Sequence, residues 1–270
     1  MIKKIKLPLI VALCTFLCAC SVYRQTVQTR SVANNGKAWA SAWQQRAAEY
    51  KALCFQAYNS AHLHLDQAIK IPSTKPLAIV TDIDETVLDN SPYDAQRALN
   101  NLEYDTKTWK EWTAKAIADT VAGAPSFFKY AASKGITIFY ITNRDEDERA
   151  ATLKNLQRYG LPNADNAHLL LRTTSSSKES RRQQVLKTHN IILLCGDNLP
   201  DFDALYDNKP TEQNRDKATR KLTNQFGTKY IVLPNPSYGD WEGALYKFNY
   251  KLTPAEKDSV IRSVTKVSGE

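Results

Sequence analysis

Ile79-Val80-Thr81-Asp82-Ile83-Asp84-Glu85-Thr86 is a short apolar run with β-branched residues that ends in two carboxylates one residue apart. Side chains alternate along a strand, so Asp82 and Asp84 leave its end on the same side. Two acids that face the same way repel each other unless a cation lies between them. A hard divalent ion such as Mg²⁺ prefers oxygen ligands and pairs readily with phosphate. The pair therefore indicates phosphoryl chemistry, with one carboxylate as nucleophile and the other as proton donor and acceptor.

Strands and helices are predicted to alternate in the chain around this run. The strands are continuous apolar blocks, expected at residues 77–81, 136–141, 168–171, 191–195 and 230–233. Helices are expected between them, at residues 124–133, 145–159, 178–188 and 212–226. Continuous apolar strands that alternate with helices are typical of a parallel sheet covered on both faces. We therefore expect an α/β fold whose core occupies residues 77–250.

Further helices are expected outside this core pattern. Residues 36–76 form an N-terminal helical region, with a long helix or a helix pair at 39–69 that Pro72 and Pro76 end. An insert at about 90–122 is expected to contain one or two helices, and residues 251–270 a helical tail. These parts are predicted to form a smaller α-helical cap domain.

The N-terminus has the pattern of an export signal, in which a basic stretch is followed by an apolar run and then by small residues. The apolar run is too short to span a bilayer as a stable helix. The junction Leu17-Cys18-Ala19-Cys20 resembles the bacterial lipobox. By that resemblance residues 1–19 are a lipoprotein signal peptide, Cys20 is lipidated, and residues 20–35 are a polar tether. The resemblance also implies the outer membrane of a Gram-negative bacterium, because Ser21 rather than Asp follows Cys20. An ordinary cleaved signal is the alternative.

Composition and charge limit the classes of molecule that the protein is expected to bind. The 270 residues are 43% hydrophobic and 24% charged, with a net charge of +8. Removal of the three lysines of the signal would leave about +5, an excess that suits anionic substrates or an anionic surface. The sequence shows no basic stripe with interleaved aromatic residues, the pattern that would indicate binding to nucleic acid. After processing only Cys54 and Cys195 would be free to pair, and the sequence leaves open whether they do.

Polar residues follow each predicted strand, where ligands bind in parallel α/β folds. Together they supply four carboxylates, a hydroxyl, an amide and a lysine, the groups that metal-assisted phosphoryl transfer requires. In chain order they are Asp82, Asp84, Thr142, Asn143, Lys178, Asp197 and Asp201.

The segments that contain these residues resemble a known family. Asp-Ile-Asp-Glu-Thr, Ile-Thr-Asn-Arg, Lys178 and Gly-Asp-Asn-Leu-Pro-Asp-Phe, in this order, are similar to the motifs of the haloacid-dehalogenase (HAD) superfamily of phosphatases. The two aspartates of the last segment resemble the class C acid phosphatases. Together with the lipobox and with residues 89–93 and 238–242, the chain resembles the lipoprotein e branch of outer-membrane 5′-nucleotidases.

The resemblance implies a role for each residue of the set. Asp82 attacks phosphorus, and Asp84 moves the proton while its backbone carbonyl helps to hold Mg²⁺. Asp197 and Asp201 complete the metal site. Thr142, the backbone N–H of Asn143 and Lys178 bind the phosphoryl oxygens.

The resemblance also implies nucleoside 5′-monophosphates as substrates, including nicotinamide mononucleotide. Aromatic side chains stack on bases, and Trp109 and Tyr238 are the pair taken over from the family. Packing in the core is the alternative for either ring. A homodimer is what the family suggests.

Two other functions compete with this one. A surface lipoprotein that binds haem or an intact nucleotide could keep the fold and lose the chemistry, but the complete set of Asp82, Asp84, Lys178 and Asp197 disfavours it. A phospho-accepting signalling domain also uses an aspartate and Mg²⁺, but the export signal and the helical insert argue against it.

Overall fold

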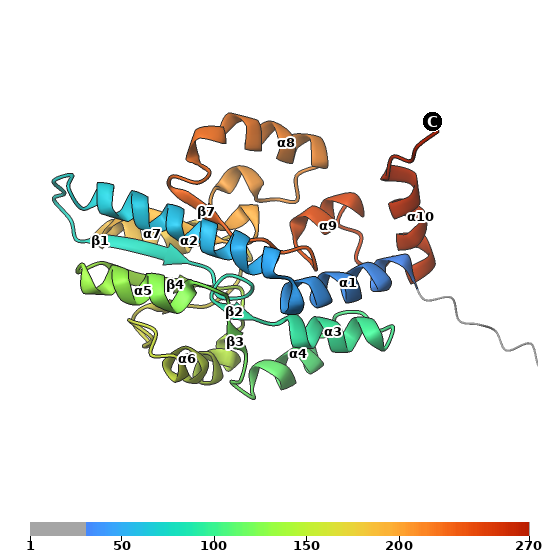
Figure 1. Ribbon diagram of the computed structural model, residues 1–270, viewed down its shortest axis with the longest axis horizontal. Coiled ribbons are helices and arrows are strands. Elements are labelled where there is room, and N and C mark those ends of the chain that lie inside the picture. Colours follow the sequence, from blue (N-terminus) through green and yellow to red (C-terminus); the bar gives the residue numbers. More distant parts are fainter. Residues whose placement is uncertain (1–30, 270) are drawn as a thin grey trace, which may run out of the picture.

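A five-stranded parallel sheet forms the centre of the protein, as seen in a computed structural model that describes residues 31–269 (Figure 1). The strand order is β5-β4-β1-β6-β7. The bounds are β1 Leu77–Thr81, β4 Thr137–Ile141, β5 Leu169–Leu170, β6 Asn190–Gly196 and β7 Tyr230–Val232. Every neighbouring pair in this sheet is parallel. The predicted α/β class is confirmed, although the third strand is shorter than the predicted 168–171.

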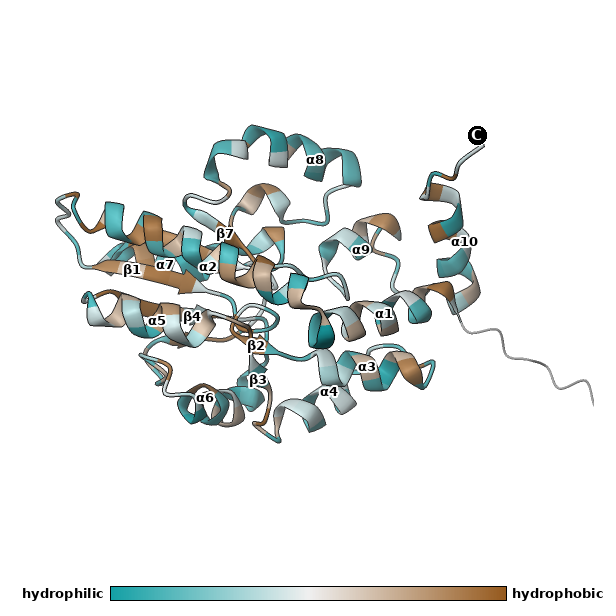
Figure 2. Ribbon diagram, viewed as in Figure 1, coloured by the Kyte–Doolittle hydropathy of each residue, from teal (hydrophilic) through white to brown (hydrophobic). Residues whose placement is uncertain are grey.

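Strand β1 lies in the middle of the sheet, because its apolar side chains are buried on both faces. It pairs with β4 from Ala78↔Thr137 to Thr81↔Tyr140, and with β6 on its other side. The carboxyl end of β1 therefore opens at the centre of the sheet edge. Figure 2 shows β1 in brown along its length, whereas helix α8 (Glu212–Lys221) at the surface is mostly teal.

Each face of the sheet packs against its own layer of helices. On one face lie α2 (Ala48–Ala68), α5 (Ala124–Ser133) and α6 (Arg149–Arg158), whose buried side chains include Tyr58 and Phe127. On the other face α7 (Glu179–Thr188) and the turn at Phe202 cover Val80 and Leu194. The core is thus divided by the sheet, as a doubly covered parallel sheet requires.

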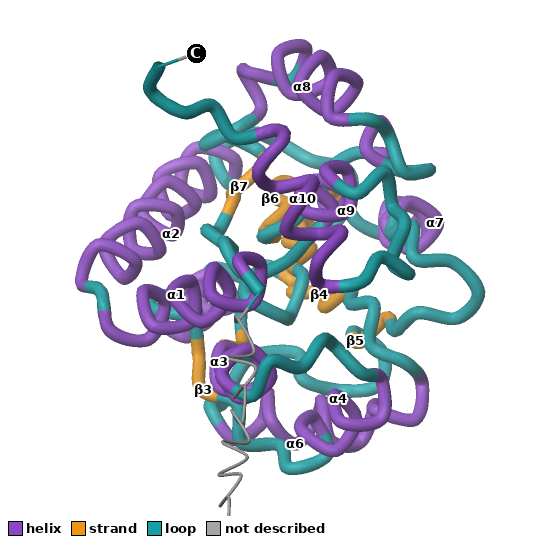
Figure 3. Tube along the Cα trace, turned by 90° about the vertical axis from the view of Figure 1, so that its right-hand side faces the viewer, coloured by secondary structure: helices purple, strands orange, loops and turns teal. Residues whose placement is uncertain are grey.

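A further group of helices lies beyond the carboxyl ends of the strands (Figures 1 and 3). They are α1 (Val32–Arg46), α3 (Ser91–Leu99), α4 (Thr106–Thr113), α9 (Asp240–Leu245) and α10 (Pro254–Val264). Helix α1 packs against both α3 and α10, which joins the N-terminal region to the insert and to the C-terminal tail. These helices bring together the three sequence regions predicted to form the cap.

Two local features differ from the sequence prediction. Helix α1 begins at Val32, so the helical region extends into the segment 20–35 that was predicted to be a tether. Asp258 of α10 fixes this start, because its carboxylate accepts hydrogen bonds from the Ser31 hydroxyl at 2.7 Å and from the backbone N–H of Val32 at 3.0 Å. Besides its two helices, the insert contains the short strand β3 (Asp119–Thr120), which pairs antiparallel with β2 (Leu88–Asp89) just before the insert.

Other predictions concern the N-terminus and the cysteines. The signal peptide 1–19 and the acceptor Cys20 lie outside the described residues. Within residues 31–269 no helix is both long enough and apolar enough to cross a membrane. Cys54 and Cys195 are free, buried thiols, so they do not pair with each other.

The packing of α2 against the sheet predicts a contrast between two leucines of that helix. Leu65 is fully buried, whereas Leu63 is 56% exposed. Leu65→Ala should lower the free energy of unfolding by about 2–5 kcal/mol, because it leaves a cavity in the core. Leu63→Ala, the matched control, should change it by no more than about 0.5 kcal/mol. Urea unfolding followed by circular dichroism measures both, and equal effects would contradict the assigned burial.

Candidate active site

The predicted site residues meet at the carboxyl edge of the sheet. Asp82 and Asp84 follow β1, Thr142 and Asn143 follow β4, and Asp197 follows β6. Lys178 directly precedes α7, and Asp201 lies in the 3-10 turn Leu199–Asp201 after β6. Contacts between them form two groups, one centred on Lys178 and the other on Asp84.

Lys178 joins two of the carboxylates. Its Nζ donates to Oδ1 of Asp82 and, at 2.7 Å, to Oδ1 of Asp201. All three residues are buried. Burial raises the pKa of Asp82 to about 7, although the charge of Lys178 opposes this rise. Burial alone would lower the pKa of Lys178, but the two carboxylates reverse the direction and raise it. The ammonium group therefore stays charged next to the proposed nucleophile.

Asp201 is held in place by the backbone around it. The N–H of Asn198 donates to its Oδ2 at 3.0 Å, and Arg182 of α7 donates to its carbonyl at 2.8 Å. Gly196 at the end of β6 makes this close packing possible, because a Cβ there would lie 2.4 Å from Oδ2 of Asp201. In the sequence Gly196-Asp197, Asp197 thus presents its carboxylate at the strand end, while Gly196 leaves room for the carboxylate of Asp201.

Three carboxylates are close enough to share one cation. Ligand oxygens of Asp82, Asp197 and Asp201 lie within 4.8 Å of one another. Burial raises the pKa of Asp197 well above its usual value, and repulsion from Asp201 and Asp82 adds to the rise. A divalent ion would offset both effects, and an all-oxygen donor set suits a hard ion such as Mg²⁺. These residues therefore fit the expected metal.

Asp84 has different partners, so its carboxylate is not part of this cluster. Arg144 donates to its Oδ1 through Nη2 at 2.7 Å and through Nε at 3.1 Å. Asn90 donates to the same oxygen at 2.9 Å, and the Thr142 hydroxyl approaches Oδ2 at 3.5 Å. Only the backbone carbonyl of Asp84 is left for the expected role as a metal ligand. The two acids of the opening motif are thus separated by their partners, lysine for Asp82 and arginine for Asp84.

Thr142 and Asn143 are placed differently from each other. Thr142 is fully buried, and its hydroxyl also accepts the backbone N–H of Arg144 at 3.2 Å. Asn143 is exposed, and its side chain accepts a hydrogen bond from Arg181 at 2.7 Å. Its backbone N–H donates to no acceptor in the described part of the chain. That N–H is therefore free for a phosphoryl oxygen, whereas the Thr142 hydroxyl already contacts Asp84.

The two aromatic candidates lie on different segments. Trp109 of α4 packs edge-on against Tyr93, with ring centroids 5.3 Å apart, and the guanidinium of Arg144 lies 5.8 Å from its ring centroid. Tyr238 follows β7, and its hydroxyl donates to the buried carboxylate of Glu85. Among residues 31–269 no ring contact joins Trp109 to Tyr238.

Sequence reasoning missed several residues that hold the site. Arg144 fixes Asp84, while Asn235 donates to Oδ2 of Asp197 at 2.7 Å and Thr86 to its Oδ1 at 3.4 Å. The rule that polar residues after strands converge could have found Asn235, because it follows β7. Arg144 stood in the motif Ile-Thr-Asn-Arg, but its partner could not be read from the sequence.

Gly196→Ala should disrupt this site without unfolding the protein. The added methyl overlaps the Asp201 carboxylate, which must move away from Lys178 and from the other two acids. We expect the stabilisation by Mg²⁺ or Mn²⁺ in thermal unfolding to be largely lost. Gly36→Ala is the matched control, because a Cβ there meets no atom within 4 Å. An unchanged metal response in Gly196→Ala would place the metal elsewhere.

Known proteins share both the sequence pattern and the fold. The profile of the HAD superfamily, subfamily IIIB (acid phosphatase), matches residues 12–241. The crystal structure of the class C acid phosphatase from Bacillus anthracis with tungstate bound superposes with a TM-score of 0.83 and 43% identity, covering 87% of this chain and 98% of that one.

Two plant proteins are more distant. Acid phosphatase 1 of Solanum lycopersicum is 25% identical over 167 residues, which are 59% of this chain and 57% of the tomato protein. The stem 31 kDa glycoprotein of Glycine max is 26% identical over 126 residues, which are 44% of this chain and 50% of the soybean protein. The chain therefore spans only about half the length of these two relatives. The match over most of the chain and the shared fold establish that the protein belongs to subfamily IIIB of the HAD superfamily, the acid phosphatases.

Proposed function

We propose that the protein is a Mg²⁺-dependent phosphatase that hydrolyses nucleoside 5′-monophosphates, including nicotinamide mononucleotide. The observation that carries this proposal is the placement of Asp82 on the central strand end, next to Lys178 and within reach of Asp197 and Asp201. The class C enzyme of Bacillus anthracis was solved with tungstate, a tetrahedral oxyanion like phosphate.

The first half of the reaction transfers the phosphoryl group to the protein. A carboxylate oxygen of Asp82 attacks phosphorus and the bond to the nucleoside oxygen breaks, leaving an aspartyl-phosphate. Asp84 gives its proton to the departing oxygen. Lys178 balances negative charge on the phosphoryl oxygens, and the free N–H of Asn143 donates to one of them. Arg144 keeps the Asp84 carboxylate in a fixed orientation throughout.

The second half restores the enzyme. Asp84, now ionised, takes a proton from a water molecule as that water attacks phosphorus, and the bond to Asp82 breaks. Phosphate leaves, and Asp84 is again protonated. When bound, Mg²⁺ would be held by Asp82, Asp197, Asp201 and the backbone carbonyl of Asp84, and would neutralise charge on the phosphoryl group.

The nucleoside part of the substrate would lie against aromatic side chains beside the site. Arg144 contacts both Trp109 and Asp84, so Trp109 lies near the site. This position supports a role of Trp109 in base stacking. The Tyr238 hydroxyl donates to Glu85, which lies between Asp84 and Thr86 in the loop after β1, so Tyr238 also lies beside the site. Stacking is tolerant of base identity, because every base has an aromatic face.

The proposed setting is the cell envelope. Lipidation at Cys20 would anchor the domain to the outer membrane, where nucleotides must lose phosphate before uptake as nucleosides. Such an enzyme would serve nucleotide and NAD scavenging, and a homodimer is the assembly we propose. A binding lipoprotein for haem or nucleotide with degenerate chemistry is less favoured, because Asp82, Asp84, Lys178 and Asp197 are all retained, with Lys178 in contact with Asp82 and Asp201.

Hydrolysis of 5′-AMP by the purified protein tests this function. We expect phosphate release that stops in EDTA and returns with added Mg²⁺. Asp82→Asn should reduce kcat by at least about a thousandfold, because the amide is a poor nucleophile. Circular dichroism of this variant checks that the fold is intact. Turnover that continues in EDTA, or in Asp82→Asn, would reject the proposed site.

A comparison of two substrates tests the base-stacking role of Trp109. Trp109→Ala should lower kcat/KM for 5′-AMP by roughly 5- to 150-fold, the loss expected from one stacking contact of about 1–3 kcal/mol. The loss for a small aryl phosphate should be much smaller. Equal losses for both substrates would show that Trp109 acts only through packing with Tyr93 and Arg144.

A further inference from the structure

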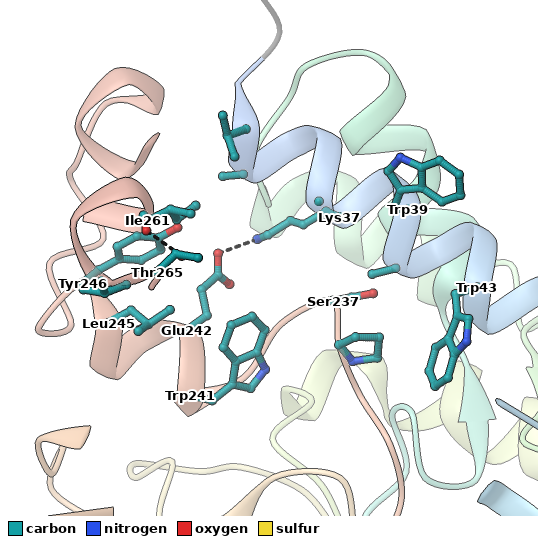
Figure 4. Close-up of a pocket in the computed structure, with 16 residues that line it drawn as sticks. Lys37, Trp39, Trp43, Ser237, Trp241, Glu242, Leu245, Tyr246, Ile261 and Thr265 are labelled. Carbon is teal, nitrogen blue, oxygen red and sulfur yellow. Dashed lines mark hydrogen bonds and ion pairs between the residues drawn. The ribbon is translucent and has the colours of Figure 1, made fainter. Parts of the chain in front are cut away.

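A cavity lies apart from the carboxylates, between α1, α9 and α10 (Figure 4). Its volume of about 580 Å³ lies within the roughly 300–1,000 Å³ of ordinary ligand pockets. The walls are mostly carbon, with side chains that include Trp39, Trp43, Trp241, Ile261 and Val264. We call this cavity the tryptophan groove, because three of the five tryptophans of the chain line it.

The groove exposes apolar surface that a free protein would normally bury. Trp39 is 78% exposed, Val264 47% and Trp241 43%. Contiguous apolar surface of this kind marks interaction sites rather than ordinary protein surface. The indole N–H of Trp241 donates to the carbonyl of Tyr238 at 3.0 Å, a contact that orients the ring.

The groove also contains polar groups that suit the head of an amphiphile. Ser237 is 1% exposed, and its hydroxyl has no hydrogen-bond partner among the described residues. A buried hydroxyl without a hydrogen-bond partner lowers the stability of the protein, so we expect a bound molecule to supply that partner. Lys37 of α1 and Glu242 of α9 form an ion pair at 3.0 Å across the groove, and Figure 4 shows both within the lining. The lining therefore fits a long apolar chain with a polar end.

The position of the groove indicates where such a molecule comes from. Val32, the first residue of α1, lines the groove. In the sequence, the proposed lipid acceptor Cys20 stands eleven residues before Ser31. Eleven extended residues reach at most about 40 Å. Indole rings also favour the boundary between water and hydrocarbon.

We propose that the tryptophan groove binds the acyl chain of a membrane phospholipid and thereby docks the domain on the bilayer surface. The proposal rests on the membrane address included in the proposed function. Segment 233–241 connects the two sites, because Asn235 contacts Asp197 while Ser237 and Trp241 line the groove. A lipid in the groove would thus lie directly behind a segment that holds a metal ligand.

The five tryptophans allow a direct test on the full chain. Trp109→Phe/Trp112→Phe leaves emission only from the groove, and Trp39→Phe/Trp43→Phe/Trp241→Phe leaves emission only from the insert. The probe is a brominated lysophosphatidylcholine below its micelle concentration, which needs no anchor on the protein. We expect it to quench most of the groove emission and little of the insert emission. Equal quenching of both sets, or none of either, would overturn the proposal.

A pair of valines separates groove binding from general surface adsorption. Val264→Asp places a charge in the groove wall and should weaken lysolipid binding about tenfold or more, because an acyl chain would desolvate that charge. Val267→Asp is the matched control, because Val267 is 59% exposed and does not line the groove. Equal affinities would contradict the assigned site.

Two further measurements distinguish other outcomes. Flotation with phospholipid vesicles of the Cys20→Ser chain, which cannot be lipidated at that position, tests docking by the groove without the anchor. We expect this variant to float and the further change Val264→Asp to reduce its flotation; flotation that Val264→Asp leaves unchanged would contradict the proposal. Sedimentation tests whether a second copy of the chain fills the groove. If the groove emission resists quenching and Val264→Asp converts a dimer into a monomer, the occupant is a second copy and the lipid proposal is wrong.

Discussion

The contact of the Lys178 ammonium with two buried carboxylates is the interaction on which the site depends. Three acids gathered at one sheet edge tend to take up protons, because burial raises the pKa of Asp82 and of Asp197 and repulsion between the acids adds to the rise. Lys178 offsets part of this repulsion, and its position depends on α7, whose Arg182 also binds the backbone at Asp201. The fold therefore has to bring β1, β6 and α7 together before the site can exist.

Sequence reasoning succeeded where the signal was local. Apolar blocks such as residues 77–81 are strands because they are buried on both faces, and polar residues after them had to meet at one edge. It failed where the outcome depended on contacts distant in sequence. Strands β2 and β3 have two residues each, too few to show an alternation, and α1 begins at Val32 because Asp258 near the other end of the chain caps it.

The same limit explains the partners that were missed. Arg144 was visible in the sequence after the second strand, yet nothing in its neighbours indicates that its guanidinium turns back to Asp84 rather than toward solvent. Asn235 becomes part of the site only because the chain after β7 folds over Asp197. The tryptophan groove is assembled from α1 and from helices near the C-terminus, so no periodicity could have predicted it.

Arg144 also connects chemistry with substrate choice. Its guanidinium holds the Asp84 carboxylate and lies against the ring of Trp109, so the proposed proton-transfer group and the proposed stacking surface share one neighbour. A base that stacks on Trp109 must use the part of the ring that Arg144 leaves free, or displace the guanidinium and loosen Asp84. Because a loosened Asp84 would transfer protons less well, substrates that leave the pair intact would be favoured. Selectivity at this site would then depend on kcat as well as on binding.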